Sequence, residues 1–420
     1  MEKIIVRGGR KLQGEVDISI AKNSVLPIIV ATILNPTEII LKKVPMLEDV
    51  TVLINLLREL NCEVQFSSIT GDLKINTLNL KEVDPNSELI RKMRASFLVM
   101  GPMLARFGRC KISMPGGCNI GSRPVDLHLK GFKSLGIESE IGYGYVEAKV
   151  DKLHGNRIYL DFPSVGATEN IMMAAILAPG ITVIENAAEE PEIWDLARFL
   201  NSMGAKIEGA GYGKITIHGV SQLKQPEPFT PIFDRIEAGT FMVAAGITNS
   251  KITINGVNEE HLMPTIEKLK ECGVYCSIDG QKMIVDGTQE KKPVDIKTMT
   301  YPGFPTDMQA QIMALLSITR GVSVITETVF ENRFMHVGEL GRMGANIKID
   351  GRIAIVEGVS TLTGCEVKAT DLRAGAAMIL AGLVANGETE IGEVYHIDRG
   401  YTNIEEKFKK LGAEIYRIHK

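Results

Sequence analysis

The sequence predicts an α/β protein of two halves, each built from three copies of one helix–strand repeat. Two observations indicate this class. Six times along the 420 residues, an amphipathic stretch ends in an apolar residue and a Gly or Asn, and a short alternating segment follows. Ahead of most of these stretches lies another kind of segment, rich in Ala, Met and Ile on all sides. A pattern that recurs about every seventy residues indicates a repeated supersecondary unit.

The six junctions mark the end of the second helix in each repeat. Gly, or Asn as the next choice, takes the left-handed conformation that follows many helix ends. Apolar residues before a junction have helical spacing, as in Ile193, Leu196 and Leu200, and those after it alternate, as in Ala345–Ile349. The junctions are Leu60-Asn61, Leu135-Gly136, Met203-Gly204, Cys272-Gly273, Met343-Gly344 and Leu411-Gly412.

The first helix of each repeat is expected to be buried. Asn170–Ala178, Gly239–Ala245 and Ala374–Ala381 have little polar surface on any side, which is typical of a helix enclosed by the protein. A β-rich segment follows the helix, for instance Gly180–Glu185. The repeat is therefore helix, strand, helix, strand. The Met and Ala stripes in these helices are read as core and not as a cofactor-binding motif.

One proline-rich segment divides the chain into three repeats and three repeats. Gln225–Pro231 contains three prolines, which favour an extended linker. Periodicity alone leaves open whether the N-terminal strand pairs with the first half or with the second.

Composition limits the functional classes. The chain is 45% hydrophobic and 23% charged with a formal net charge of −4, which argues against a general nucleic-acid or anionic-membrane binder. The N-terminus lacks the apolar core of a signal peptide, and no apolar run is long enough to span a bilayer. The six cysteines are scattered, and Cys272 and Cys276 have no second ligand pair, so no metal site is expected. A cytoplasmic, reduced protein is expected.

The loop Pro115–Asp126 is the strongest candidate for chemistry. It holds Cys118 among three glycines, five residues before Arg123. Glycines let the backbone approach a ligand closely, and a nearby guanidinium favours the thiolate and can hold a phosphate or carboxylate bidentately. The combination indicates acid–base or nucleophilic chemistry on an anionic substrate. A structural turn with an incidental cysteine is the alternative.

Charged residues recur at two phases of the repeat. One phase is the start of the first helix and the other is the loop that leads to the second helix, where Arg123 and Arg399 each precede their junction glycine by thirteen residues. Helix starts present free N–H groups and the positive end of the macrodipole. We expect two such faces, opposed across a hinge, to form a cleft for phosphates and carboxylates. The residues at these phases are Lys22, Arg94, Asp307 and Arg373, then Arg123, Arg333 and Arg399.

Several of these segments are long enough to indicate a family. The chain resembles, over its full length, the UDP-N-acetylglucosamine 1-carboxyvinyltransferases of the enolpyruvyl transferase family. The matching segments are Lys22-Asn23, Met93–Ser96, Pro115–Leu127, Ser164–Thr168, Phe304–Gln309, Glu327–His336, Ala369–Ala374 and His396–Tyr401.

The resemblance implies both a reaction and a fold. The family transfers the enolpyruvyl group of phosphoenolpyruvate to the 3-hydroxyl of a sugar nucleotide and releases phosphate, the first committed step of peptidoglycan synthesis. It uses no cofactor. Its fold is a two-domain inside-out α/β barrel, or α/β prism, of six βαβαββ repeats. Here the domains would be 22–229 and 1–21 plus 230–420, with the N-terminal strand in the second domain and the active site in the cleft.

The resemblance also assigns roles to residues. Cys118 would be the general acid, on a mobile lid, and the target of the inhibitor fosfomycin; Asp307 would take the proton from the 3-hydroxyl. Cations around phosphoenolpyruvate would be Lys22, Arg123 and Arg399, supported by Arg373, with Arg333 close to the phosphate. Contacts to UDP-N-acetylglucosamine would come from Asn23, Arg94, Arg123, Pro124, Val125, Asp126, Leu127, Ser164, Val165, Gly166 and Val329.

Departures and alternatives follow from the same comparison. Several relatives have a basic residue where this chain has Phe162, so nucleotide contacts there would use the backbone.

A 5-enolpyruvylshikimate-3-phosphate synthase is disfavoured because that family lacks the cysteine loop, and a silent sugar-nucleotide sensor is disfavoured because Cys118, Asp307 and Lys22 are all present. A cysteine hydrolase would need a base from outside the Cys118 motif. No Gly-x-Gly-x-x-Gly or P-loop pattern occurs at a strand–helix junction. Protein partners, and which of two paralogues this chain is, stay open.

Overall fold

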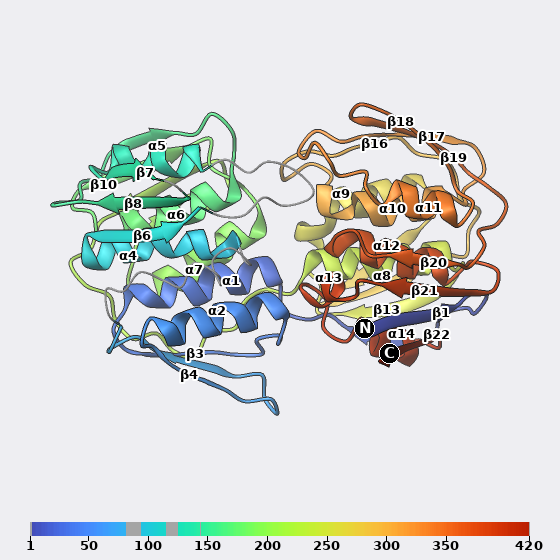
Figure 1. Ribbon diagram of the computed structural model, residues 1–420, viewed down its shortest axis with the longest axis horizontal. Helices are drawn as coiled ribbons and strands as arrows, with labels where there is room; N and C mark the ends of the chain where they lie inside the picture. Colours follow the sequence, from blue (N-terminus) through green and yellow to red (C-terminus); the bar gives the residue numbers. More distant parts are fainter. Residues whose placement is uncertain (1, 81–93, 115–124, 143, 420) are drawn as a thin grey trace. The chain divides into compact units, whose positions relative to one another are not determined.

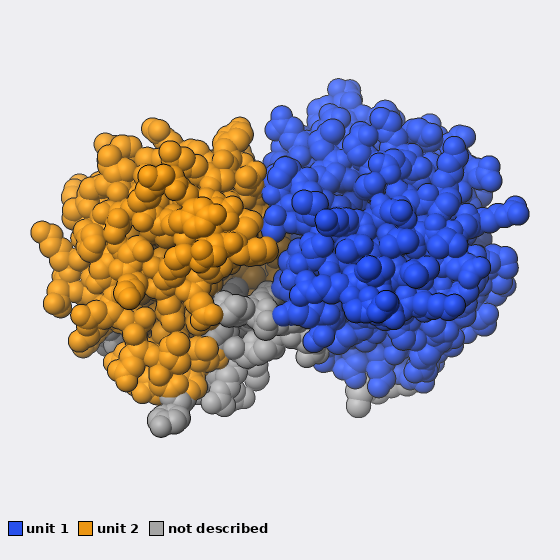
Figure 2. All heavy atoms as spheres, turned by 90° about the horizontal axis from the view of Figure 1, so that it is seen from above, with its two compact units in different colours: residues 1–19, 118–122, 233–420 blue, residues 20–117, 123–232 orange. Residues whose placement is uncertain are grey.

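The computed structural model describes residues 2–80, 94–114, 125–142 and 144–419. Within these ranges the chain forms two compact units (Figure 2). Unit 1 comprises residues 2–19 and 233–419, and unit 2 comprises residues 20–114 and 125–232. The described chain passes between the units at 19–20 and at 232–233. The expected boundaries, at 21–22 and 229–230, differ from these by two and three residues.

The described part of unit 2 contains three sheets, with strand orders β3-β5-β4, β6-β8-β7 and β11-β12-β10-β9. Its elements are α1 (Lys22–Ala31), η1 (Thr32–Leu34), β3 (Glu38–Leu41), α2 (Glu48–Glu59), β4 (Glu63–Phe66), β5 (Leu73–Asn76), η2 (Arg94–Val99), α4 (Met100–Phe107), β6 (Arg109–Ser113), α5 (Asp126–Ser134), β7 (Glu138–Ile141), β8 (Tyr145–Lys149), β9 (Arg157–Tyr159), α6 (Val165–Ala175), β10 (Ile181–Glu185), α7 (Pro191–Ser202), β11 (Lys206–Glu208) and β12 (Lys214–His218).

Unit 1 contains three four-stranded sheets within its described residues, β20-β21-β1-β22, β14-β15-β13-β2 and β16-β17-β19-β18. Its elements are β1 (Glu2–Arg7), β2 (Glu15–Asp17), α8 (Arg235–Ile247), β13 (Lys251–Asn255), α9 (Glu259–Glu271), β14 (Tyr275–Asp279), β15 (Lys282–Asp286), β16 (Ile296–Lys297), η3 (Thr306–Met308), α10 (Gln309–Leu316), β17 (Val322–Thr326), α11 (Val337–Arg342), β18 (Asn346–Asp350), β19 (Ile353–Glu357), β20 (Glu366–Lys368), α12 (Leu372–Gly382), β21 (Glu388–Gly392), α13 (Tyr395–Asp398), α14 (Ile404–Lys410) and β22 (Glu414–His419).

The predicted repeat junctions are confirmed by the backbone. All six adopt the left-handed conformation, in which a residue without a Cβ is least strained. Their φ angles lie between 63° and 96°, and the one junction without glycine, Asn61, has the lowest of them. Each junction directly follows an amphipathic helix and precedes a strand. The junction residues are Asn61, Gly136, Gly204, Gly273, Gly344 and Gly412.

Strand pairing within a repeat follows the βαβαββ order. In the third repeat β9 runs parallel to β10, which is joined to it through α6, and β12 then pairs antiparallel with both β10 and β11. The fifth repeat is built the same way from β16, β17, β18 and β19. The parallel pair β9–β10 needs the crossover helix α6 between its strands, whereas the antiparallel pair β11–β12 needs only a hairpin. The predicted fold class is confirmed.

Two repeats exchange their first strand. β2 precedes α1 in the sequence, yet it pairs in parallel with β13 of the fourth repeat. Conversely, Phe229 precedes α8 but pairs in parallel with Leu41 at the end of β3. The proline-rich segment is therefore extended, as expected, but it is not a free linker. Phe229 is only 7% exposed, and its ring packs against Phe199 at 5.0 Å between centroids.

The first helices form the centre of each unit, and the sheets surround them (Figure 1). In unit 1 the helices α8, α10 and α12 pack on one another. Every residue of α10 and every residue of α12 except Leu372 is buried, which matches their predicted lack of a polar face. In the described part of the chain, no helix combines the length and the apolar character that a membrane span requires.

Two buried carboxylates hold the chain where it passes between the units. In unit 1, Glu237 accepts a hydrogen bond from the Ser19 backbone N–H at 2.6 Å and one from Lys407 Nζ at 2.6 Å. In unit 2, Asp195 accepts hydrogen bonds from the backbone N–H of Ile232 at 2.9 Å and from the hydroxyl of Ser24. A carboxylate that accepts from a part-buried backbone N–H fixes that segment, because the N–H would otherwise lose its partner.

Candidate functional site

Asp307 is the centre of an ion cluster in unit 1, in which it pairs with two buried arginines. It lies in η3, at the start of the fifth repeat's first helix, and its side chain is 27% exposed. Arg333 Nη2 donates to Oδ1 at 3.0 Å, and Arg373 donates to Oδ2 from Nε at 3.1 Å and from Nη2 at 3.0 Å. The sequence predicted these three residues as site residues, and the structure brings them together.

The charges decide the protonation state of this cluster. Burial alone would raise the pKa of Asp307, but the positive charges of Arg373 and Arg333 outweigh it and hold that pKa well below its usual range. The carboxylate is therefore ionised. Arg373 is almost fully buried, and the negative charge of Asp307 overcomes the burial penalty and raises its pKa above the usual range. The cluster thus joins an ionised carboxylate to two guanidinium groups.

Local structure places each member of the cluster. Asp371 caps α12 by accepting from the backbone N–H of Arg373 at 2.8 Å and of Ala374 at 3.0 Å, which orients the first turn of that helix. The Arg373 guanidinium lies 5.3 Å from the centroid of the Tyr401 ring. The Tyr401 hydroxyl shares a hydrogen bond of 2.9 Å with Thr240 on α8. The Tyr401 ring therefore packs against the Arg373 guanidinium.

Glu327 forms the support for the neighbouring loop. This carboxylate is 1% exposed and accepts four hydrogen bonds. Oε1 accepts from the Thr298 hydroxyl at 2.8 Å, from Val329 N–H at 2.8 Å and from Phe330 N–H at 3.2 Å, and Oε2 accepts from the Thr306 hydroxyl at 2.9 Å. Thr306 immediately precedes Asp307. Glu327 therefore positions both the Val329 loop and the carboxylate of the cluster.

Arg399 directly follows the short helix α13, and ion pairs fix the position of the preceding residue. The preceding residue, Asp398, accepts from Arg417 Nη2 at 2.6 Å and from Nη1 at 2.9 Å. Arg417 also donates from Nε to Glu405 at 2.7 Å. Burial and the charge of Arg399 lower the pKa of the neighbouring His396, so that imidazole is neutral near pH 7.

Unit 2 holds the other described candidates. Lys22 begins α1, is 8% exposed, and forms a 2.5 Å ion pair with Asp49 in the first turn of α2. Asn23, next along α1, is exposed. Burying an ammonium is costly unless an anion accompanies it, and Asp49 supplies that anion. Sequence reasoning did not single out Asp49.

The starts of α5 and α6 lie side by side in unit 2. The Ser164 side chain caps α6 by accepting from Ala167 N–H at 3.4 Å. A Cβ placed on Gly166 would lie 3.4 Å from the His128 ring on α5, an ordinary van der Waals distance, so the two helix starts are neighbours. The predicted residues brought near one another here are Val125, Asp126, Leu127, Ser164, Val165 and Gly166.

Three predicted residues, Cys118, Arg123 and Pro124, lie outside the described residues, and the side chain of Arg94 is not described either. Phe162, the departure noted in the sequence, is 46% exposed two residues before Ser164. Its backbone C=O accepts from Ser164 N–H at 2.7 Å.

Sequence reasoning missed Arg235, although the repeat pattern contains the signal. Arg235 is the first residue of α8, as Lys22 is the first residue of α1 and Arg94 is the first residue of η2. Its positive charge is a further cause of the lowered pKa of Asp307. Glu327 and Tyr401 lie within the segments that resemble the family, but burial and hydrogen bonding cannot be read from a sequence motif.

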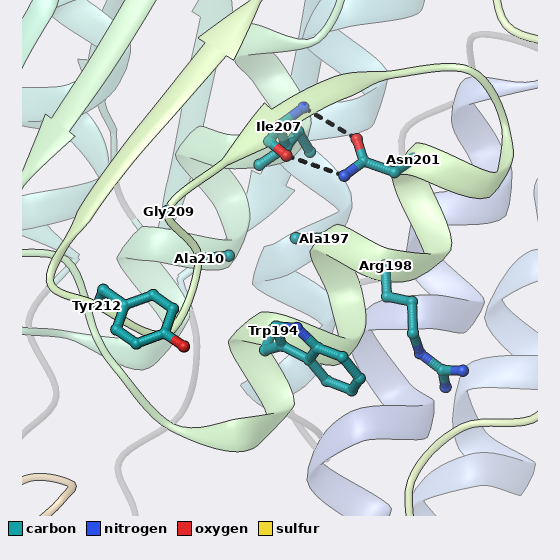
Figure 3. Close-up of a pocket in the computed structure, with 8 residues that line it drawn as sticks. All are labelled: Trp194, Ala197, Arg198, Asn201, Ile207, Gly209, Ala210 and Tyr212. Atoms are coloured by element: carbon teal, nitrogen blue, oxygen red, sulfur yellow. Dashed lines mark hydrogen bonds between the residues drawn. The ribbon is translucent and has the colours of Figure 1, made fainter.

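A surface pocket of about 330 Å³ lies between α7 and the β11–β12 hairpin of unit 2 (Figure 3). Trp194 and Tyr212 are aromatic side chains on its margin. The Asn201 side chain donates a hydrogen bond to the Ile207 C=O and accepts one from the Ile207 N–H. The described residues that line it include no predicted site residue.

Known proteins resemble this chain over its whole length. The EPSP synthase (3-phosphoshikimate 1-carboxyvinyltransferase) family profile matches residues 6–408. UDP-N-acetylglucosamine 1-carboxyvinyltransferase 2 of Clostridium tetani is 65% identical over 418 residues and covers 100% of both chains. UDP-N-acetylglucosamine 1-carboxyvinyltransferase 1 of Clostridium acetobutylicum is 63% identical with the same coverage.

Solved structures share the fold at lower identity. The enolpyruvyl transferase NikO from Streptomyces tendae has a TM-score of 0.90 and 23% identity, covering 99% of this chain and 98% of that one. EPSP synthase from Acinetobacter baumannii has a TM-score of 0.74 and 18% identity, with 100% of both chains covered. Together with the family profile and the close relatives, these findings show that the chain belongs to the EPSP synthase family of enolpyruvyl transferases.

Proposed function

We propose that the chain transfers the enolpyruvyl group of phosphoenolpyruvate to the 3-hydroxyl of UDP-N-acetylglucosamine and releases phosphate. The observation that carries this proposal is the full-length identity of 63–65% with two relatives that bear the name of this activity. The Asp307–Arg333–Arg373 cluster supports it, because a fixed carboxylate amid arginines suits an anionic substrate that must lose a proton. Both substrates are cytoplasmic metabolites, so we place the reaction in the cytoplasm.

The addition step needs an acid and a base. The methylene carbon of phosphoenolpyruvate must gain a proton while the sugar hydroxyl, losing its own, attacks the neighbouring carbon. We assign the acid to Cys118 by resemblance, and the base to Asp307. Because Asp307 has a strongly lowered pKa, it is a weak base, and its main contribution is a correctly oriented, permanently ionised acceptor for the hydroxyl proton.

The elimination step reverses the proton transfer at carbon and expels phosphate. Negative charge accumulates on the departing phosphate, so cations must lie near it. We assign Lys22, Arg123 and Arg399 to this task by resemblance, with Arg373 and Arg333 orienting Asp307. Lys22 now pairs with Asp49, so a substrate anion would compete with that carboxylate for the ammonium.

The sugar nucleotide would be held mainly by unit 2. We propose that the starts of α5 and α6, with Asn23 and Arg94, contact it, and that Val329 contacts it from unit 1. The start of α6 presents the positive end of a helix dipole, which favours a phosphate. Because Phe162 supplies no charge, we expect backbone contacts near the diphosphate.

Phosphate release tests the proposal directly. Purified protein with phosphoenolpyruvate should release phosphate only when UDP-N-acetylglucosamine is present, and Cys118→Ser should abolish release while Cys118→Asp retains part of it, since a carboxylic acid can still deliver a proton. Binding of the sugar nucleotide without phosphate release would identify a silent sensor instead. Release that depends on shikimate 3-phosphate would identify an EPSP synthase.

A further inference from the structure

A buried polar network in unit 1 contacts both Asp307 and Arg373. Its members are Gln311 on α10, Thr240 on α8 and Tyr401 after α13, each at most 2% exposed. Gln311 Nε2 donates to the Asp307 backbone C=O at 2.8 Å, and it lies 3.3 Å from Thr240 Oγ1 and 3.4 Å from the Tyr401 hydroxyl. The Tyr401 ring packs against the Arg373 guanidinium. One network therefore reaches the main chain of Asp307 and the side chain of its partner.

The donors and acceptors of this network leave one arrangement of protons. The Thr240 hydroxyl donates its single proton to the backbone C=O of Ile236 at 2.8 Å, so the Tyr401 hydroxyl must donate to Thr240 Oγ1 at 2.9 Å. Burial raises the pKa of Tyr401, so the hydroxyl keeps that proton near pH 7. A carbonyl can only accept, so the amide nitrogen of Gln311, and not its oxygen, faces Asp307. The second amide hydrogen is left for the two hydroxyl oxygens.

This arrangement fixes two groups whose relative position matters. Asp307 belongs to η3, a three-residue 3₁₀-helix, and such short pieces have poor hydrogen-bond geometry of their own. The bond from Gln311 ties the main chain of Asp307 to the third residue of α10. Tyr401 limits where the Arg373 guanidinium can lie, and Arg373 donates two hydrogen bonds to the Asp307 carboxylate. A catalytic group works well only when its neighbours hold it within about 0.5 Å of the productive geometry.

We infer that Gln311 and Tyr401 are positioning residues that hold the Asp307 carboxylate and the Arg373 guanidinium in the geometry required for reaction. The inference rests on the proposed function for the reaction itself. Both side chains are buried, so they act through Asp307 and Arg373 and not by contact with a substrate. Their loss should therefore lower the turnover of bound substrates and leave the affinity for the sugar nucleotide, which we assign mainly to unit 2, unchanged.

The test compares Gln311→Met and Tyr401→Phe with a matched control, Gln309→Met. Gln309 is equally buried and lies two residues away, on the opposite side of α10, and its amide bonds none of the described residues. Gln311→Met should lower kcat about ten- to a hundredfold, because small misplacements of a reacting group have effects of that size. Tyr401→Phe keeps the ring and loses a neutral hydrogen bond, so it should lower kcat about three- to tenfold. Gln309→Met should keep kcat within about twofold of wild type.

Calorimetry should give a dissociation constant for UDP-N-acetylglucosamine within about twofold of wild type for all three variants. A kcat unchanged in both Gln311→Met and Tyr401→Phe would overturn the inference. An equal loss of kcat in Gln309→Met would also overturn it, because any change in the buried face of α10 would then suffice. If Gln311→Met does not fold, Tyr401→Phe alone decides, since that change removes a single oxygen atom.

A crystal structure of Gln311→Met gives a readout that does not depend on activity. We expect at least one of the two hydrogen bonds from Arg373 to Asp307, which measure 3.0 and 3.1 Å, to be lost. If both bonds stay unchanged, the inference is wrong whatever substrate the enzyme uses. Absence of phosphate release by the wild-type enzyme would instead refute the proposed function.

Discussion

Replacing Glu327 should destabilise unit 1 more than any surface substitution. The Glu327→Ala variant leaves the backbone N–H groups of Val329 and Phe330 without their acceptor, while the hydroxyls of Thr298 and Thr306 can rotate toward other groups. Both N–H groups are part-buried, and a fully buried group left unsatisfied costs about 1–3 kcal/mol. With the lost side-chain packing, we expect the free energy of unfolding to fall by about 3–5 kcal/mol. Glu327→Gln keeps one acceptor oxygen and should cost about 1–2 kcal/mol.

Urea unfolding followed by circular dichroism measures this difference, and thermal unfolding should show a midpoint lower by about 6–20 °C for the alanine variant. Glu357→Ala is the matched control, since Glu357 is an exposed glutamate of β19 that accepts one hydrogen bond from Asn346. We expect that control to stay within about 0.5 kcal/mol of wild type. If Glu327→Ala unfolds within about 1 kcal/mol of wild type, its four hydrogen bonds do not support the loop as argued.

Three further predictions concern ionisation, thiols and substrate separation. Burial lowers the pKa of His336 from 6.5 to about 4, so the unfolded chain binds a proton that the folded chain does not, and stability should fall as pH drops from about 6.5 to 4. A His336→Gln variant that keeps the same slope in acid unfolding would contradict this. Fosfomycin should alkylate Cys118 and spare Cys62, whose pKa burial raises to about 12; peptide mapping that finds the adduct on Cys62 refutes it. Arg399→Ala should raise KM for phosphoenolpyruvate about ten- to a hundredfold with little change in sugar-nucleotide affinity, and Arg94→Ala should do the reverse; equal losses for both substrates would show inseparable subsites.

The repeat could be predicted from sequence because its signals are local. A left-handed residue after a helix must be Gly or Asn for steric reasons, and all six such positions have positive φ. Helices without a polar face must be buried, and α10 and α12 are. The exchange of β2 and the Phe229 segment between repeats could not be predicted, because strand partners far apart in sequence leave no periodic signal.

The candidate site was predicted in part for the same reason. Charge at a fixed repeat phase indicated Asp307 and Arg373, and the structure joins them in one ion cluster. The same rule, applied to the fourth repeat, also indicates Arg235 at the start of α8. Glu327 is different: its role depends on accepting hydrogen bonds from Thr298 and from its own loop, and no sequence pattern contains that information.

The N-terminal strands complete sheets that are otherwise built from the second half of the chain. β1 lies between β21 and β22, pairing antiparallel with both, and β2 pairs with β13, so residues 2–19 supply strands to two sheets of unit 1. These pairings join the start of the sequence to its last strand and therefore have the highest loop-closure cost in the chain. Unit 2 instead draws all of its described elements from residues 20–232. The described sheets of unit 2 therefore need no strand from the C-terminal part of the chain, whereas the sheet that contains β1 cannot form until β22 is available.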